Sequence, residues 1–420
     1  MHDFSGHPFQ VQLSRELAGR GHHVRHTYST QFVTGRGRLE VEAADPATLR
    51  IEGVTCRRPM VKYSPVGRTR FELDYASTWR ASFEREPADV VVACNVPLFA
   101  LSRMKRHFAR TGQPWVLWHQ DLYSLGVGAE AARKLPGPLA DLARSAVERL
   151  ERAQVHAASS VVAISEAMVH QYHRWGVTRD DVQVIPNWAP LDDITPGARD
   201  NAWARAHHLP EKAVRLMYAG TLGRKHNALL LLDILDAAKA RGIDAHLVVA
   251  SEGVGADDLA AAAGSRPDVQ IVGYQPAAEL SDMLASADVV LALLEPDAAY
   301  FSVPSKVLTY LAAGRPIAAL VPVGNPAAQD VARIGGFVGA PTAQGAADAA
   351  EWLRHAVDRP HGLATIGQAA RDLAETRFAI ARIGDSFEQV LHTALGRKGS
   401  GLTPMPARVE DPTAADRIAS

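Results

Sequence analysis

Residues 289–320 read VVLALLEPDAAYFSVPSKVLTYLAAGRPIAAL, and this stretch decides the fold. An apolar strand comes first and enters a loop with two carboxylates, Glu295 and Asp297. The pair Pro304-Ser305 then starts a helix, which Gly314 ends before the next apolar strand. A strand, a loop, a helix and a strand in this order are typical of a parallel sheet covered by helices.

Apolar runs alternate with amphipathic helical patterns along the whole chain, which predicts an α/β fold with open, doubly wound parallel sheets. An irregular segment at 186–191 contains two prolines and separates two sets of runs. We therefore expect two domains at 1–190 and 191–377, a helix at 378–396 that returns to the first domain, and a disordered tail at 397–420. The runs lie at 90–93, 115–117, 161–164 and 182–185, and then at 216–219, 247–250, 270–272, 289–293 and 317–320.

The start of the chain departs from this pattern. Residues 2–8 read as a loop that leads into a helix, and a doubly wound domain should place a strand before that loop. We expect this first strand to be missing, either because the reading frame starts further upstream or because the domain lacks it.

The composition is that of an ordinary globular chain of 420 residues, with 47 % apolar and 22 % charged residues. The formal net charge of −1 provides no overall attraction to nucleic acid. The two cysteines, Cys56 and Cys94, have no CxxC spacing, so we expect neither a disulfide framework nor a cysteine metal site, and a cytoplasmic location fits. No apolar stretch approaches the roughly 20 residues of a membrane span, and no signal peptide is visible.

One loop of the second domain has the pattern of a diphosphate site. Gly220, Thr221 and Gly223 follow an apolar strand and precede a helix, and Arg224 and Lys225 add cations at the same place. Glycines allow the backbone to approach a ligand, and a helix N-terminus attracts an anion. The alternative is a tight turn with solvated basic residues.

A second loop points to the same chemistry. Ser305 and Lys306 fall at a predicted helix N-terminus, where a lysine is unfavourable unless an anion is bound. We therefore interpret Lys306 as a phosphate ligand. Because ligands of open α/β sheets bind beyond the carboxyl ends of the strands, we expect both loops to belong to one site.

The first domain places polar residues at equivalent positions. His119 and Asp121 follow one apolar strand, and Ser165 and Glu166 follow the next. A structural role for His119 is an equal alternative. Ser165 can also serve as a helix cap, and Glu166 as a first-turn charge.

Seven motifs, taken in order, make the chain resemble the retaining glycosyltransferases of family 4, in the branch that includes colanic-acid and exopolysaccharide enzymes. The resemblance implies the GT-B fold, in which two Rossmann-like domains face each other and a C-terminal helix crosses back. The motifs are HDFSGHPFQ at 2–10, WHQD at 118–121, ISE at 164–166, VIPNW at 184–188, AGTLG at 219–223, KHN at 225–227 and VPSK at 303–306.

The resemblance implies that the second domain binds a nucleotide sugar as donor. Lys225 would contact the diphosphate, with Lys306 and Arg224 beside it, and Tyr274 would lie near the base. The other residues expected on the donor side of this domain are Gly220, Thr221, Gly223, Glu295, Asp297, Ser302, Pro304 and Ser305.

For the first domain, the resemblance implies contacts with both substrates. Gly6 and His7 would face the donor across the cleft, and His119 would face the reacting sugar. The acceptor would bind on this side, where Asp121 and Glu166 are candidates.

The chain departs from the family at one motif. Many members carry two glutamates eight positions apart, the second of them five residues before Gly-x-Pro. These positions hold Phe301 and Thr309 here. The branch often has the Pro-Ser-Lys variant, so transfer is still expected, with Glu295 and Asp297 as candidates, by proximity, for orienting the donor.

We therefore expect a retaining hexosyltransferase that moves a sugar to a saccharide or polyprenyl-linked saccharide in exopolysaccharide synthesis. Lysines and helix N-termini can stabilise the leaving diphosphate, so no metal or cofactor is predicted. The alternatives are a sugar-nucleotide epimerase of the same fold and a degenerate, non-catalytic partner subunit.

The segment 103–152 bears on the membrane. It has nine Lys or Arg against five Asp or Glu, so it suits peripheral contact with anionic lipid at the inner membrane face. Ordinary solvated helix faces are the alternative.

Overall fold

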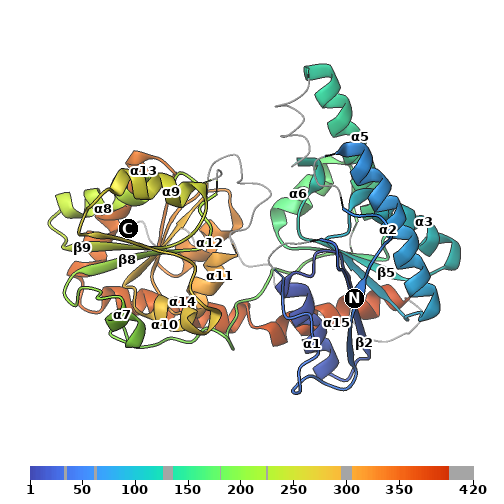
Figure 1. Ribbon diagram of the computed structural model, residues 1–420, viewed down its shortest axis with the longest axis horizontal. Helices are drawn as coiled ribbons and strands as arrows, with labels where there is room; N and C mark the ends of the chain where they lie inside the picture. Colours follow the sequence, from blue (N-terminus) through green and yellow to red (C-terminus); the bar gives the residue numbers. More distant parts are fainter. Residues whose placement is uncertain are drawn as a thin grey trace, which may run out of the picture.

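The computed structural model describes residues 1–32, 36–60, 64–125, 136–179, 181–223, 226–294 and 305–396. These residues form two α/β domains, each built on one parallel sheet (Figure 1). The predicted fold of two doubly wound domains is confirmed. The predicted tail at 397–420 lies outside the described residues.

The first domain contains a seven-stranded sheet in the order β3-β2-β1-β4-β5-β6-β7, and each neighbouring pair is parallel. Its strands are β1 His2–Asp3, β2 Val24–Ser29, β3 Leu49–Val54, β4 Val91–Cys94, β5 Trp115–His119, β6 Ser160–Ala163 and β7 Val182–Val184. Its helices are α1 Pro8–Gly19, α2 Pro65–Arg85, α3 Leu98–Thr111, α5 Gly137–Ala157 and α6 Glu166–Arg174.

The second domain contains a six-stranded sheet in the order β10-β9-β8-β11-β12-β13, again with parallel pairs. Its strands are β8 Val214–Ala219, β9 Ala245–Ala250, β10 Val269–Val272, β11 Val289–Leu293, β12 Ile317–Leu320 and β13 Phe337–Gly339. Its helices are α7 Ala202–Ala206, α8 Leu230–Ala240, α9 Val254–Ala263, α10 Leu280–Ala285, α11 Lys306–Ala312, α12 Pro326–Arg333, α13 Ala343–Asp358 and α14 Gly362–Arg377, with a 3₁₀ turn at Ala277–Glu279.

The expectation that the first strand is missing was wrong. His2–Asp3 forms a two-residue strand at the centre of the first sheet, where it pairs with both β2 and β4. The imidazole of His2 is buried, stacks on Trp79 with ring centres 3.7 Å apart, and shares a hydrogen bond of 2.8 Å with the Thr27 hydroxyl. Burial lowers the pKa of His2 well below its usual value, so its imidazole is neutral in the core. The strand was missed because its residues are polar, whereas the run of residues expected for a central strand is apolar.

The last helix, α15 Ile380–Gly396, packs on the first domain beside α1 (Figure 1). Its Phe387 is fully buried against Trp118, with ring centres 4.8 Å apart. The chain therefore passes between the domains twice, once after β7 and once before α15. The N–H of Ala189 donates to the carbonyl of Phe378 at 2.9 Å, so the two crossings are bonded to each other.

We expect Phe387→Ala to destabilise the first domain, because it opens a cavity between α15 and the sheet. Loss of a buried phenyl ring costs about 3–5 kcal/mol. Denaturant unfolding followed by tryptophan fluorescence measures the effect. The matched control is Leu395→Ala on the same helix, whose side chain is 42 % exposed, and it should change stability by less than about 1 kcal/mol. Equal effects of the two variants would contradict the assigned packing of α15.

Candidate active site

The order of strands in the second sheet reverses between β8 and β11, and the two strands separate there. They pair only through Leu216 with Val289 and Met217 with Val290. Beyond that point the Tyr310 hydroxyl replaces β11 as the hydrogen-bond partner of β8. It accepts from the N–H of Ala219 and donates to the Ala219 carbonyl, both at 3.0 Å. Ligands of open α/β sheets bind at such a reversal point.

Lys306 lies one helical turn before Tyr310 and reaches the same place. Its ammonium group hydrogen-bonds to the Tyr218 hydroxyl and lies 4.0 Å from the centre of that ring. Burial raises the pKa of Tyr218, so the phenol stays neutral beside the cation. The structure thus places Lys306 next to the end of β8, where the Gly220 loop begins.

Gly220 follows β8 and requires the freedom of glycine, because its φ is +123°. A Cβ atom at this position would lie 3.4 Å from Nζ of Lys306. The backbone of Gly220 and the Lys306 ammonium group therefore share one small region. Ser305 precedes Lys306, is exposed, and makes no side-chain capping bond to α11.

The rest of this loop faces the turn after β10. The Thr221 hydroxyl is hydrogen-bonded to that of Tyr274, whose side chain is half-exposed. The N–H of Gly223 donates to Nδ1 of His226 at 3.1 Å. Glu252, which is not among the predicted site residues, accepts from the N–H of Tyr274 at 3.4 Å. Its place directly beyond β9 was the signal that could have identified it.

Several predicted donor residues lie outside the described residues. They are Arg224, Lys225, Glu295, Asp297, Ser302 and Pro304, together with Phe301 from the altered glutamate motif.

The first sheet reverses its order between β1 and β4, and Asp3 organises the loop at that point. Its carboxylate accepts from Ser5, from the N–H of His7 at 2.7 Å and from the Asn95 amide at 3.1 Å. Gly6 has a φ of +68°, which strains any residue with a side chain, and a Cβ there would also displace the end of the Leu39 side chain, 2.7 Å away. Asp3 was not among the predicted site residues, although it adjoins them in the sequence.

His7 follows Gly6 and is the residue directly before α1, at its N-cap position. Its side chain is half-buried, and burial lowers the pKa of its imidazole. His7 can therefore present a neutral ring at the carboxyl edge of the first sheet.

His119 lies at the end of β5 and is only 6 % exposed. Its Nδ1 is 2.8 Å from the Tyr172 hydroxyl, and its Nε2 is 3.7 Å from the carboxylate of Glu151. Burial opposes the charge of Glu151, yet the nearby imidazole of His119 and the hydrogen bond from the N–H of Ser124 hold its pKa below the usual value. Both ring nitrogens thus face partners inside the first domain. Asp121 is exposed two residues further on.

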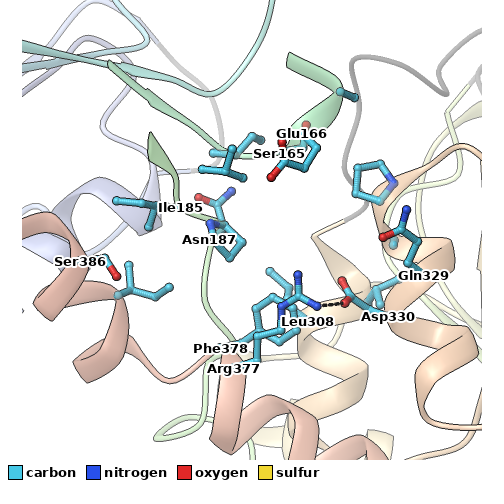
Figure 2. Close-up of a pocket in the computed structure, with 18 of the residues that line it drawn as sticks. Ser165, Glu166, Ile185, Asn187, Leu308, Gln329, Asp330, Arg377, Phe378 and Ser386 are labelled. Carbon is cyan, nitrogen blue, oxygen red and sulfur yellow. Dashed lines mark hydrogen bonds and ion pairs between the residues drawn. The ribbon is translucent and has the colours of Figure 1, made fainter. Parts of the chain in front are cut away.

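A cavity of about 580 Å³ lies between the domains (Figure 2). It holds the predicted residues Ser165 and Glu166, and its opposite wall begins at Val307, next to Lys306. Arg377 and Asp330 form an ion pair of 3.0 Å at its edge. The other lining residues come from the end of β6, α6, the β7 crossing, α11, α12, the end of α14, Phe378 and the start of α15.

Two family models match the chain. A glycosyl transferase 4-like domain matches residues 7–188, and a domain of glycosyl transferases group 1 matches residues 213–356. The first match contains every strand of the first sheet except β1, and the second contains all the strands of the second sheet. No curated protein sequence matches the chain.

Solved structures share the two-domain arrangement over nearly the whole chain. Sucrose-phosphate synthase from Thermosynechococcus elongatus is 16 % identical with a TM-score of 0.67, over 93 % of this chain and 97 % of that one. Anabaena Alr3699/HepE in complex with UDP-glucose is 16 % identical with a TM-score of 0.63, over 93 % and 98 %. WaaG, a glycosyltransferase involved in lipopolysaccharide biosynthesis, is 17 % identical with a TM-score of 0.63, over 93 % and 97 %.

We expect Tyr310→Phe to destabilise the second domain, because it leaves the buried N–H and C=O of Ala219 without their partner. Such a loss costs about 1–3 kcal/mol. The control is Tyr28→Phe, which removes a hydroxyl for which the described residues provide no hydrogen-bond partner. Urea unfolding of both variants tests the assignment. A stability loss no greater than that of the control would show that the hydroxyl does not hold β8.

Proposed function

We propose that this chain, a glycosyltransferase with the GT-B fold, transfers a sugar from a nucleoside diphosphate to a saccharide or lipid-linked acceptor. The transfer retains the configuration of the sugar and serves the synthesis of cell-surface polysaccharide. The family 4 resemblance supports retention and the exopolysaccharide role. The UDP-glucose complex of Anabaena HepE supports a nucleotide-sugar donor.

The observation that carries the proposal is the position of Lys306. Its ammonium group lies beside Gly220 and Tyr218, where β8 and β11 separate. A diphosphate bound against the Gly220 backbone would have this cation within reach. Because negative charge grows on the diphosphate as the sugar leaves, a fixed cation there stabilises the transition state more than the ground state.

In the proposed step, the bond from the anomeric carbon to the diphosphate oxygen breaks. A bond from the same carbon to an acceptor hydroxyl oxygen forms on the same face of the sugar. The proton of that hydroxyl ends on the departing diphosphate. The transition state resembles an oxocarbenium ion, and the proposal assigns no metal and no cofactor to the step.

We assign the remaining residues to the two switch points, which are the places where the strand order of each sheet reverses. Gly220, Thr221, Gly223, Tyr274 and Ser305 belong to the donor side by their position around Lys306 and β10. Gly6 and His7 would meet the donor from the first domain. His119 would act through the orientation of neighbouring groups, because its own nitrogens are held by Tyr172 and Glu151.

We expect Lys306→Ala to lower kcat/KM for the donor by about 10²–10³, because it removes one preorganised charge donor. The control is Lys212→Ala, an exposed lysine before β8, at the opposite edge of the same sheet. Release of nucleoside diphosphate from UDP-, GDP- and TDP-sugars measures both. Full activity of Lys306→Ala would refute the diphosphate assignment.

The same donor panel separates the alternatives. Transfer to an added saccharide or polyprenyl-linked acceptor supports the proposed function. Inversion at C2 of the donor sugar without acceptor would indicate an epimerase of this fold. Silence with every donor would indicate a non-catalytic partner subunit.

We further propose that the first domain makes peripheral contact with anionic lipid at the inner membrane face. Arg103, Arg106 and Arg110 are exposed along α3, which contains no acidic residue, and they form no ion pair within the described part of the chain. Leu139 and Leu142 are 53 % and 60 % exposed on the first turns of α5, which project from the domain (Figure 1). No helix in the described ranges could itself cross a bilayer.

Flotation with phosphatidylglycerol vesicles tests this contact. We expect the wild type to float, and charge reversal of Arg103, Arg106 and Arg110 to glutamate to reduce binding at least about tenfold, since each basic residue contributes about 1 kcal/mol. The charge-matched control reverses Arg333, Arg354 and Arg359 on the second domain. Failure of the wild type to float, or equal loss in the control, would remove the proposal.

A further inference from the structure

Glu151 is a buried carboxylate to which the proposed function gives no role of its own. It lies on α5, and its side chain is 0 % exposed. An ionised carboxylate is costly to remove from water unless hydrogen bonds replace the water. Burial alone would raise the pKa of Glu151, but the His119 imidazole and the N–H of Ser124 lower it more, so the carboxylate is ionised in the core.

Both oxygens of this carboxylate hold the loop that follows β5. One oxygen accepts from the N–H of Tyr123, and the other accepts from the N–H of Ser124 at 2.9 Å. These two residues begin a helical turn, and the first N–H groups of such a turn have no partner within it. The carboxylate satisfies both groups with hydrogen bonds to a charged acceptor, which are roughly twice as strong as neutral ones.

The other end of this loop is held by the first crossing between the domains. The side-chain amides of Gln120 and Asn187 exchange two hydrogen bonds, each 2.9 Å long. Between the two attachments Leu122 is buried, whereas Asp121 is exposed. The loop is therefore held on both sides, and Asp121 is the residue that it presents to solvent.

The same carboxylate faces the imidazole of His119. Its Oε1 lies 3.7 Å from Nε2 of the ring, while Nδ1 lies 2.8 Å from the Tyr172 hydroxyl. Burial raises the pKa of Tyr172, so its phenol is neutral and has one proton to donate. In the part of the chain that the structure describes, that hydroxyl has no acceptor other than Nδ1. A ring that accepts at Nδ1 carries its proton on Nε2, toward Glu151.

These contacts meet at the carboxyl edge of the first sheet, where ligands of such sheets bind. His119 ends β5, which is the neighbour of β4. The Tyr123 hydroxyl donates to the carbonyl of Asn95 at 3.4 Å, and the Asn95 amide donates to the carboxylate of Asp3 at 3.1 Å. Glu151 is thus linked, through Tyr123 and Asn95, to the loop that Asp3 organises.

We infer that Glu151 is a positioning residue for glycosyl transfer, because it fixes the loop 120–124 and the ring of His119 without itself reaching the surface. The inference rests on the proposed function and adds a residue to it. Since the proposed donor site is at Lys306 on the other domain, loss of Glu151 should lower kcat and leave the donor KM unchanged. Misplacement of a reacting group by about 1 Å costs on the order of 10²-fold in rate.

The test compares two changes of glutamate to glutamine on α5. Glu151→Gln keeps the size of the side chain, but its amide can accept only one of the two N–H groups, since its nitrogen is itself a donor. With the donor that the panel identifies, we expect kcat to fall about 10–100-fold and the donor KM to stay within about twofold of the wild type. The matched control is Glu148→Gln, whose carboxylate lies 3.7 Å from Arg144 of the same helix, and it should change neither constant.

Two further measurements separate positioning from lost stability. Val155→Ala shortens a buried side chain on the same helix, so it should lower Tm and leave kcat unchanged at temperatures where the protein is folded. Heteronuclear NMR of the imidazole groups, with the His119 signals assigned from a His119→Gln variant, reports the proton position without turnover. We expect the Nε2–H tautomer of His119 in the wild type and a mixture of tautomers in Glu151→Gln.

An unchanged kcat in Glu151→Gln, or an Nδ1–H tautomer of His119 in the wild type, would overturn the inference. If Glu151→Gln does not fold, Tyr172→Phe decides, because it removes only the other partner of the His119 ring, and an unchanged kcat with an unchanged tautomer would again overturn the inference. The donor panel judges the proposed function separately. Active transfer with an unchanged Glu151→Gln variant refutes only the positioning role, whereas silence of the wild type with every donor refutes the function.

Discussion

The hydrogen bonds between the Tyr310 hydroxyl and the backbone of Ala219 support the rest of the second-domain site. Strand β8 loses its pairing with β11 after Met217, and an unpaired buried backbone would be costly there. One side chain from α11 satisfies both groups of Ala219. Lys306 lies one turn before Tyr310 on the same helix. The hydrogen bonds between Tyr310 and β8 therefore also place the Lys306 ammonium group at the end of β8. Gly220 then needs only its unusual backbone angle to leave room for that cation.

In the first domain, a different side chain provides hydrogen bonds to the backbone where strand pairing ends. At its reversal point between β1 and β4, the carboxylate of Asp3 accepts from the backbone of Ser5 and His7 and from the amide of Asn95. Burial raises the pKa of Asp3, and these hydrogen bonds oppose that effect. Both switch points are thus organised by a buried polar group that replaces a missing strand partner. Each loop gains a fixed shape without a ligand, which is the preorganisation that electrostatic catalysis requires.

The sequence indicated the two sheets and the Gly220 and Lys306 loops, because apolar runs and the glycines and charges that follow them are local patterns. It missed β1, since His2 and Asp3 are polar and owe their burial to neighbours far along the chain. The partners of His119 were equally hidden, because Tyr172 is 53 residues away and reaches it only through the packing of α6. Local sequence patterns predict where strands and their loops lie along the chain. The hydrogen-bond partners of a buried polar group depend on tertiary packing, which such patterns do not contain.

The bond between Ala189 and Phe378 constrains how the domains can move. The two crossings lie side by side and are joined at 2.9 Å. Rotation about a line through both crossings keeps that distance, whereas twisting one domain against the other would shear it. Bending of the domains about the two crossings therefore preserves this hydrogen bond, whereas twisting breaks it. Such bending would change the gap between Glu166 and Gln329 and the distance from the first-domain loop to Lys306 together.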